Sequence, residues 1–137
     1  MLIAVYGTLM SHSGSIRSGL LSKHAELVGP CEIRGDLYSV GSAFPALRPG
    51  DGVVKGELWR TDNPYATASL LRMTDGIEGY RPEDPEHSMY RRVAVQLIEP
   101  DVVAWTYVWN REPDRHLTRI PSGDWRAWSE GEEAVCA

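Results

Sequence analysis

The chain has 137 residues, a length typical of one domain, and its 14 basic and 19 acidic residues give a formal net charge of −5. Lys23 and Lys55 are its lysines and no basic cluster is present, so we expect no nucleic-acid partner, because phosphate binding requires a basic surface. No apolar run is long enough to span a membrane and no leader is evident, so we expect a soluble cytoplasmic protein without a membrane partner.

The first predicted element is a buried strand that begins at Leu2 and stops before Gly7. A glycine directly after a buried strand indicates a sharp turn, whose backbone N–H groups are released from the sheet and become available to a ligand. Beyond this turn, Ser15 is a suitable cap for a helix over residues 16–24, with Leu20 and Leu21 on its apolar face.

Two further strands are predicted over residues 31–40 and 53–61, each carrying a glycine, an acidic residue, a leucine and an aromatic residue in succession. Glycine within a strand marks a bulge or a corner, so Gly35 and Gly56 predict a curved sheet. Residues 41–52, which lie between these strands, are rich in glycine and proline and are expected to form turns.

Asn63 followed by Pro64 predicts the start of a helix, because proline at the first helical position loses no hydrogen bond. This helix is expected to end near Thr74, before Asp75 and Gly76, and to bury the leucines and the methionine of its last turns. Residues 77–89 are expected to form an irregular polar loop.

Alternating apolar residues predict paired strands over 90–99 and 102–110, joined by a turn at residues 99–101. The tail loses this periodicity, and we expect it to be frayed after about residue 128. No repeat, linker or composition change divides the chain, so residues 1–137 are predicted to form a single domain.

The residues offer no metal site and no cofactor. The histidines have neither the spacing nor the cysteine neighbours of a zinc site; they are His12, His24, His87 and His116. Cys31 opens an apolar strand and is expected to be a core residue rather than a nucleophile, and with the distant Cys136 it predicts free thiols in a reducing compartment. Phosphate loops, dinucleotide fingerprints and nucleophile elbows are absent, so we expect no cofactor.

One carboxylate has an unusual setting. Glu78 lies between Gly76 and Gly79 and follows the predicted helix end. The negative end of the helix dipole, together with burial, would raise its pKa and make it a suitable base. The alternative is that Glu78 is an ordinary loop residue and Gly76 a helix cap.

The order of these motifs resembles that of the gamma-glutamylcyclotransferase-like family, which includes the gamma-glutamylamine cyclotransferases. The shared elements lie in residues 2–110, and the Ser-Gly-Asp-Trp segment at 122–125 is similar to a tail element of some members. The matching motifs are Tyr6-Gly7-Thr8-Leu9, the two glycine-containing strands, Pro45-Ala46-Leu47, Asp75-Gly76-Ile77-Glu78-Gly79 and Tyr90-Arg91-Arg92.

This resemblance implies an α+β fold, a small mixed or antiparallel β-barrel flanked by two or more short helices. It implies that Glu78 is the general acid/base and that the loop Tyr6, Gly7, Thr8 and Leu9 holds the α-carboxylate of a γ-glutamyl amide. The α-amino nitrogen of such a substrate attacks its own γ-carbonyl, which releases an amine and 5-oxoproline. Because the attack is intramolecular, the enzyme supplies no nucleophile, metal or cofactor.

Aromatic residues are expected to wall the pocket, and the candidates are Tyr6, Tyr38, Trp59, Tyr80, Tyr90 and Tyr107. Tyr6 and Tyr107 are favoured as substrate contacts, the second by resemblance, and Tyr90 is a further one. The charges of Glu83, Asp84 and Glu86 usually indicate a solvated surface, but if their loop covers the pocket they favour a cationic leaving amine such as lysine.

Several functions remain compatible with the sequence. The same chemistry would serve to remove a γ-glutamyl protecting group from a biosynthetic metabolite, and a silent protein would keep the pocket to bind a small carboxylate. A glycosidase that pairs Glu57 with Glu78 is the weakest alternative. The partner is therefore expected to be a small γ-glutamyl molecule, bound by a monomer or a homodimer.

Overall fold

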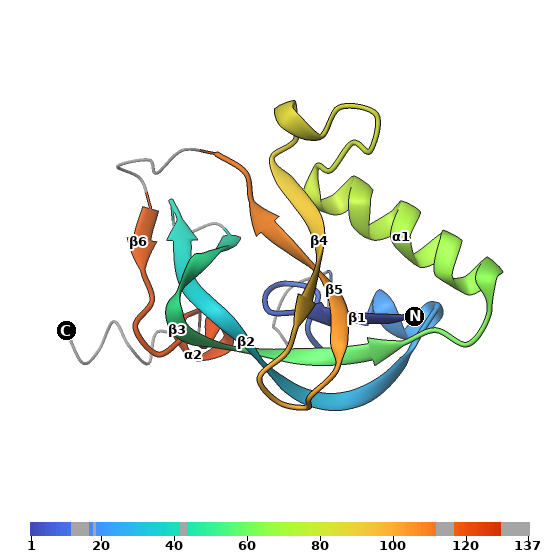
Figure 1. Ribbon diagram of the computed structural model, residues 1–137, viewed down its shortest axis with the longest axis horizontal. Helices are drawn as coiled ribbons and strands as arrows, with labels where there is room; N and C mark the ends of the chain where they lie inside the picture. The colour runs from blue at the N-terminus through green and yellow to red at the C-terminus, as the bar shows by residue number, and fades with distance from the viewer. Residues whose placement is uncertain (12–16, 18, 42–43, 112–116, 130–137) are drawn as a thin grey trace.

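The computed structural model describes residues 1–11, 17, 19–41, 44–111 and 117–129. Its strands form one six-stranded sheet in the order β4-β5-β1-β3-β2-β6, which curls into a half-barrel (Figure 1). The helix α1 lies along the outside of the half-barrel, near β4 and β1 in the view of Figure 1. The expected α+β fold with a curved sheet and flanking helices is confirmed.

The first strand lies in the middle of the sheet. β1 (Leu2–Val5) pairs antiparallel with β3 (Phe44–Arg60) and parallel with β5 (Val103–Trp109). Both faces of such a strand are covered, which is why its sequence is continuously apolar instead of alternating. The end of β1 therefore delivers the residues that follow it to the interior of the fold.

β2 (Glu26–Val40) and β3 form a long curved hairpin. The prediction that residues 41–52 form turns is wrong for residues 44–52, which form the first half of β3. Leu47 and Ala46 pair with Leu37 and Tyr38 of β2, and both are buried. Cross-strand pairing and burial thus outweigh the weak strand preference of the prolines and glycines in this segment.

Hydrogen bonds between β2 and the turn after β4 (Tyr90–Gln96) bring the two sides of the sheet together. The Glu32 N–H donates to the Glu99 carbonyl at 2.7 Å, and the Ile98 N–H donates to the Glu32 carbonyl at 2.9 Å. β4 also pairs with β5 across the predicted turn. The bridge joins strands that lie on opposite sides of β1 and β3 in the sheet order, which is how a curled sheet closes.

The helix α1 (Pro64–Glu78) begins where the sequence predicts it and ends later. The Asn63 side chain accepts a hydrogen bond from the Ala66 N–H at 2.8 Å, as expected of a cap. The expected end near Thr74 is wrong, because the helix continues through Gly76 and stops at Gly79, whose φ of 67° is left-handed. Glu78 is therefore the last helical residue and not a loop residue.

The remaining elements are short. Of the predicted helix over 16–24, residues 16 and 18 lie outside the described residues, and Leu21–Lys23 forms a single 3₁₀ turn, η1. A second one, η2 (Pro85–His87), lies in the loop after α1. β6 (Leu117–Arg119) pairs with β2, and α2 (Trp125–Ser129) follows it.

The tail is anchored up to α2, whose Trp125 is buried. The prediction of fraying after about residue 128 concerns residues 130–137, which lie outside the described part of the chain. No described helix is long and apolar enough to cross a membrane.

Candidate active site

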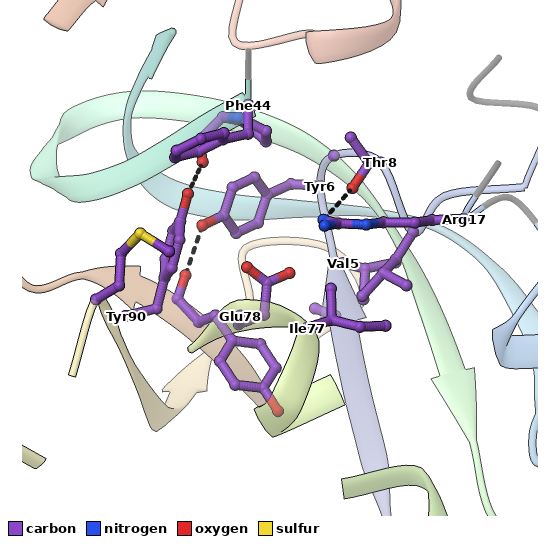
Figure 2. A pocket seen from close by; sticks show the side chains of 14 residues that line it. Val5, Tyr6, Thr8, Arg17, Phe44, Ile77, Glu78 and Tyr90 are labelled. Atoms are coloured by element: carbon purple, nitrogen blue, oxygen red, sulfur yellow. Dashed lines mark hydrogen bonds between the residues drawn. The ribbon is translucent and has the colours of Figure 1, made fainter. Parts of the chain in front are cut away.

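A cavity of about 90 Å³ opens where the ends of β1 and α1 meet the beginnings of β3 and β4 (Figure 2). A cavity of this size holds several water molecules or part of a small ligand. The seven predicted site residues all line it: Tyr6, Gly7, Thr8, Leu9, Glu78, Tyr90 and Tyr107. Residues from four separate parts of the sequence therefore meet around one space.

The loop after β1 turns sharply at the cavity wall. The Met10 N–H donates to the Gly7 carbonyl at 3.0 Å, which closes the turn. Glycine is required at position 7 because any Cβ there would collide with the ring of Pro45 on β3. Leu9 is buried and fixes the far end of the loop in the core.

Two tyrosine hydroxyls bind main-chain groups at the cavity wall. The Tyr6 hydroxyl donates to the Tyr107 carbonyl at 2.6 Å and accepts a hydrogen bond from the Leu47 N–H at 3.3 Å. The Tyr90 hydroxyl donates to the Pro45 carbonyl. Burial raises the pKa of both phenols, so both remain neutral donors. These bonds hold β1, β3, β4 and β5 together around the cavity.

Tyr107 joins this wall to the helix that carries Glu78. Its hydroxyl donates to the Asp75 carboxylate at 2.5 Å and lies 2.6 Å from the Thr74 hydroxyl. Asp75 also forms an ion pair with Arg92 at 3.1 Å. Burial, followed by the bond to Asp75, raises the pKa of the Tyr107 phenol. The hydroxyl that was predicted to contact substrate is thus engaged with the last turns of α1.

Glu78 is the carboxylate of the cavity. Figure 2 shows it directed into the space beside Tyr6, with Arg17 across from it. Burial raises its pKa from the ordinary 4.5 to about 7, and the opposite charge of Arg17 acts against this shift. The negative end of the α1 dipole acts in the same direction as burial. A carboxyl with this pKa exists in both protonation states near neutral pH, as an acid/base catalyst requires.

Arg17 is the cavity residue of most chemical consequence that the sequence did not predict. It lines the cavity, and its guanidinium donates to the Thr8 hydroxyl at 3.4 Å. It falls within the predicted helix over residues 16–24, and no motif in the sequence gave it a role in the site. The return of residue 17 onto the Tyr6 loop is a tertiary contact, for which the sequence contains no local signal.

Other residues expected near the pocket lie elsewhere. Tyr38, Trp59 and Tyr80 are not among the residues that line the cavity. Tyr80 instead stacks under the guanidinium of Arg92, 5.6 Å from its ring centre. Glu57 is also absent from the lining and binds Ser11, so the glycosidase pairing of Glu57 with Glu78 has no support.

The acidic loop does not supply charge to the cavity. Glu83 pairs with Arg81 at 3.3 Å and Asp84 pairs with His87 at 2.8 Å, and all four side chains are exposed or half-exposed. The cavity lining contains Met89 but none of these acidic residues. The condition for predicting a cationic leaving amine, that this loop covers the pocket, is therefore not met.

Cys31 is a buried core residue, as expected, and burial raises the pKa of its thiol to about 12. Such a thiol is protonated at neutral pH and is a poor nucleophile. Within the described residues, no three histidine, cysteine, aspartate or glutamate side chains are placed to hold a metal ion.

Comparison with known proteins identifies relatives of this chain. Residues 3–127 match the model of the family described as Gamma-glutamyl cyclotransferase, AIG2-like. The chain is 36% identical over 127 residues to the gamma-glutamylcyclotransferase family protein YtfP of Escherichia coli, which covers 91% of this chain and 96% of that protein. It is 33% identical over 107 residues to a putative gamma-glutamylcyclotransferase of Halalkalibacterium halodurans, and the match covers 77% of this chain and 90% of that protein.

The fold is shared with solved structures of similar proteins. The crystal structure of an AIG2-like protein from Mus musculus superposes with a TM-score of 0.60 at 28% identity, covering 82% of this chain and 79% of that chain. The family match spans nearly the whole described chain, including every residue that lines the cavity. The chain therefore belongs to the gamma-glutamyl cyclotransferase, AIG2-like family and is an enzyme of that type.

Proposed function

We propose that this enzyme converts a γ-glutamyl amide into 5-oxoproline and a free amine, with Glu78 as its general acid/base. The observation that carries the proposal is the carboxyl of Glu78, which faces a cavity and has a pKa raised to about 7 by burial. Family membership supports cyclotransferase chemistry in general, and the setting of Glu78 supports its role in the proton transfers.

The first step is the attack of the substrate's α-amino nitrogen on its own γ-carbonyl carbon. A new carbon–nitrogen bond closes a five-membered ring, and the ammonium must lose a proton before its lone pair can attack. Ionised Glu78 takes this proton. Holding the substrate folded, with the two atoms in contact, removes much of the entropic barrier of the reaction.

The second step breaks the original amide bond. Protonated Glu78 gives its proton to the departing nitrogen, which leaves as an amine and restores the carboxylate. One side chain thus acts first as base and then as acid, which a pKa near 7 permits. The ring nitrogen loses the second of its ammonium protons to solvent, and the released amine takes one proton from solvent to become an ammonium. Two protons therefore leave one nitrogen and two arrive at the other, so no net acid is consumed.

The walls of the cavity position the substrate. The turn from Tyr6 to Leu9 offers main-chain donors for the α-carboxylate, and Arg17 adds a positive charge beside Thr8. The ring of Tyr90 and the apolar side chains of Phe44 and Ile77 line the space next to Glu78. An apolar lining keeps bulk water away from Glu78, which maintains its raised pKa.

The decisive test is a mass-spectrometric assay for 5-oxoproline, with the purified protein and a panel of γ-glutamyl amides. We expect release from at least one amide by the wild type and a loss of about 10²-fold to 10⁴-fold in Glu78→Gln. An equal rate for the variant would reject Glu78 as the acid/base. No release from any amide by the wild type would reject the proposed reaction and favour a protein that only binds a small carboxylate.

A further inference from the structure

A second polar cluster lies behind the Tyr6 loop and is not used by the proposed reaction. Its centre is Glu57 on β3, which pairs in register with Val5, the last residue of β1. The Ser11 N–H donates to one Glu57 carboxylate oxygen at 2.7 Å, and the Ser11 hydroxyl donates to the other at 2.6 Å. Both oxygens of Glu57 therefore hold Ser11, which follows the loop from Tyr6 to Leu9.

Arg126 on α2 completes this cluster. One guanidinium nitrogen donates to the Ser11 carbonyl at 2.6 Å and to the Glu57 carboxylate at 3.2 Å. Ser11 is thus bound through its N–H, its hydroxyl and its carbonyl. Because a residue held at three groups has little freedom left, the path of the chain between Gly7 and Ser11 is fixed from behind.

The carboxylate of the cluster is more shielded from water than its arginine, whose side chain is 39% exposed. The Glu57 side chain is 12% exposed, so its charge is compensated mainly by Ser11 and Arg126. Charge-assisted hydrogen bonds in such a setting are stronger than those between neutral groups. Removing Arg126 would leave the largely shielded Glu57 carboxylate with an incomplete set of partners, which is unfavourable.

Arg126 is itself held firmly by the segment before it. The Asp124 carboxylate accepts from the Arg126 N–H at 3.1 Å and from the Ala127 N–H at 3.3 Å, which caps α2. Trp125 is buried, and the Lys55 N–H of β3 donates to the Gly123 carbonyl at 2.8 Å. The tail is therefore fastened to the same strand that carries Glu57.

We infer that Glu57 and Arg126 are positioning residues that hold the loop after β1 in the conformation that binds substrate. Through Arg126, the helix α2 therefore contributes to the active site. Both residues act through Ser11 and not by contact with substrate. The inference rests on the proposed function for its kinetic consequence, but the ordering of the loop by the cluster does not depend on which reaction is catalysed.

The kinetic test compares Arg126→Gln with wild type and with Arg60→Gln as a matched control. Arg60 lies on the same strand as Glu57, but it forms exposed ion pairs with Glu26 and Asp62. We expect Arg126→Gln to raise KM about tenfold, the scale of one charge-assisted hydrogen bond, with a much smaller change in kcat. Arg126→Lys, which keeps a charged donor, should recover part of the loss, and Arg60→Gln should match wild type.

The acid limb of the pH profile provides a further control. Arg126 is not among the charges that shift the pKa of Glu78. The midpoint of the acid limb should therefore be the same in Arg126→Gln as in wild type. A general loosening of the fold would expose Glu78 and lower this midpoint. KM values within twofold of wild type, a shifted midpoint, or an equal loss in Arg60→Gln would each overturn the inference.

A structural test separates this inference from the proposed reaction. Amide hydrogen exchange over residues 7–11 should be faster in Arg126→Gln than in wild type, and unchanged in Arg60→Gln, whether or not 5-oxoproline is released. If Arg126→Gln does not fold, Ser11→Ala removes the hydroxyl bond to Glu57 while keeping both charges, and should show the same faster exchange. Unchanged exchange in the folded variant would overturn the positioning role.

Discussion

The hydroxyl of Tyr6 donates a 2.6 Å hydrogen bond to the main-chain carbonyl of Tyr107, and so connects two residues 101 positions apart in the sequence. The side-chain hydroxyl of the same Tyr107 binds Asp75 and Thr74 near the end of α1. One residue of β5 therefore links the loop that lines one side of the cavity to the helix that ends in Glu78. The relative position of these two walls depends on Tyr107.

Replacing Tyr107 by phenylalanine should affect stability more than substrate binding. The change removes the hydroxyl that Asp75 and Thr74 share, but it leaves the carbonyl that binds Tyr6. We expect the free energy of unfolding to fall by about 1–3 kcal/mol, as for a buried hydrogen bond to a charged group, and KM to change less than threefold. Denaturant titration and steady-state kinetics measure the two quantities. A large rise in KM with normal stability would instead indicate that the hydroxyl contacts substrate.

The stability of the enzyme should depend on the ionisation of Glu78. A carboxyl whose pKa is higher in the folded protein than in the unfolded chain binds its proton more tightly when folded. Its stabilising effect is therefore complete below pH 4.5 and is lost as the pH rises through about 7. Glu78→Gln has no such ionisation, so it should be more stable than wild type above neutral pH, by up to about 3 kcal/mol.

Chemical denaturation of both proteins at pH 4, where about equal stability is expected, and at pH 8 tests this prediction. A difference that does not depend on pH would mean that the folded-state pKa of Glu78 is not raised.

Arg17 should control the pH at which the enzyme becomes active. Its positive charge lowers the pKa of Glu78 against the effect of burial. Arg17→Met should therefore raise that pKa, and the acid limb of kcat/KM against pH should move to higher pH. Arg17→Lys keeps a positive charge and serves as the matched control. An acid limb that moves to lower pH in Arg17→Met would contradict the electrostatic role.

The acidic loop after α1 should not select a cationic leaving amine. Glu83 and Asp84 are paired with Arg81 and His87 and lie outside the cavity lining. Their exposed charges are screened by solvent and contribute little. The ratio of kcat/KM for γ-glutamyl-lysine to that for γ-glutamyl-alanine should thus be unchanged in Glu83→Gln. A fivefold or larger fall in this ratio would show that the loop reaches the leaving group.

Local patterns in the sequence were sufficient for several parts of the fold. The apolar run of β1, the Asn63 cap with Pro64, and the alternation of β4 and β5 are properties of neighbouring residues, and the structure confirms these elements. Glycine and glutamate at positions 7 and 78 were recognised from the ordered motifs, and both line one cavity. That Glu78 acts as the catalyst remains a proposal.

Other features were decided by contacts between distant residues. Residues 44–52 form a strand because they pair with β2 and contribute side chains to the core. The helix α1 continues through Gly76 because packing outweighs the weak helix preference of one glycine. Arg17 reached the cavity, and Arg126 reached Ser11, through the path of the chain in space. Local sequence determined the strand β1, the start of α1, the strands β4 and β5 and the turn at Gly7. Only tertiary packing decided the burial that sets the pKa of Glu78 and the charges that surround it.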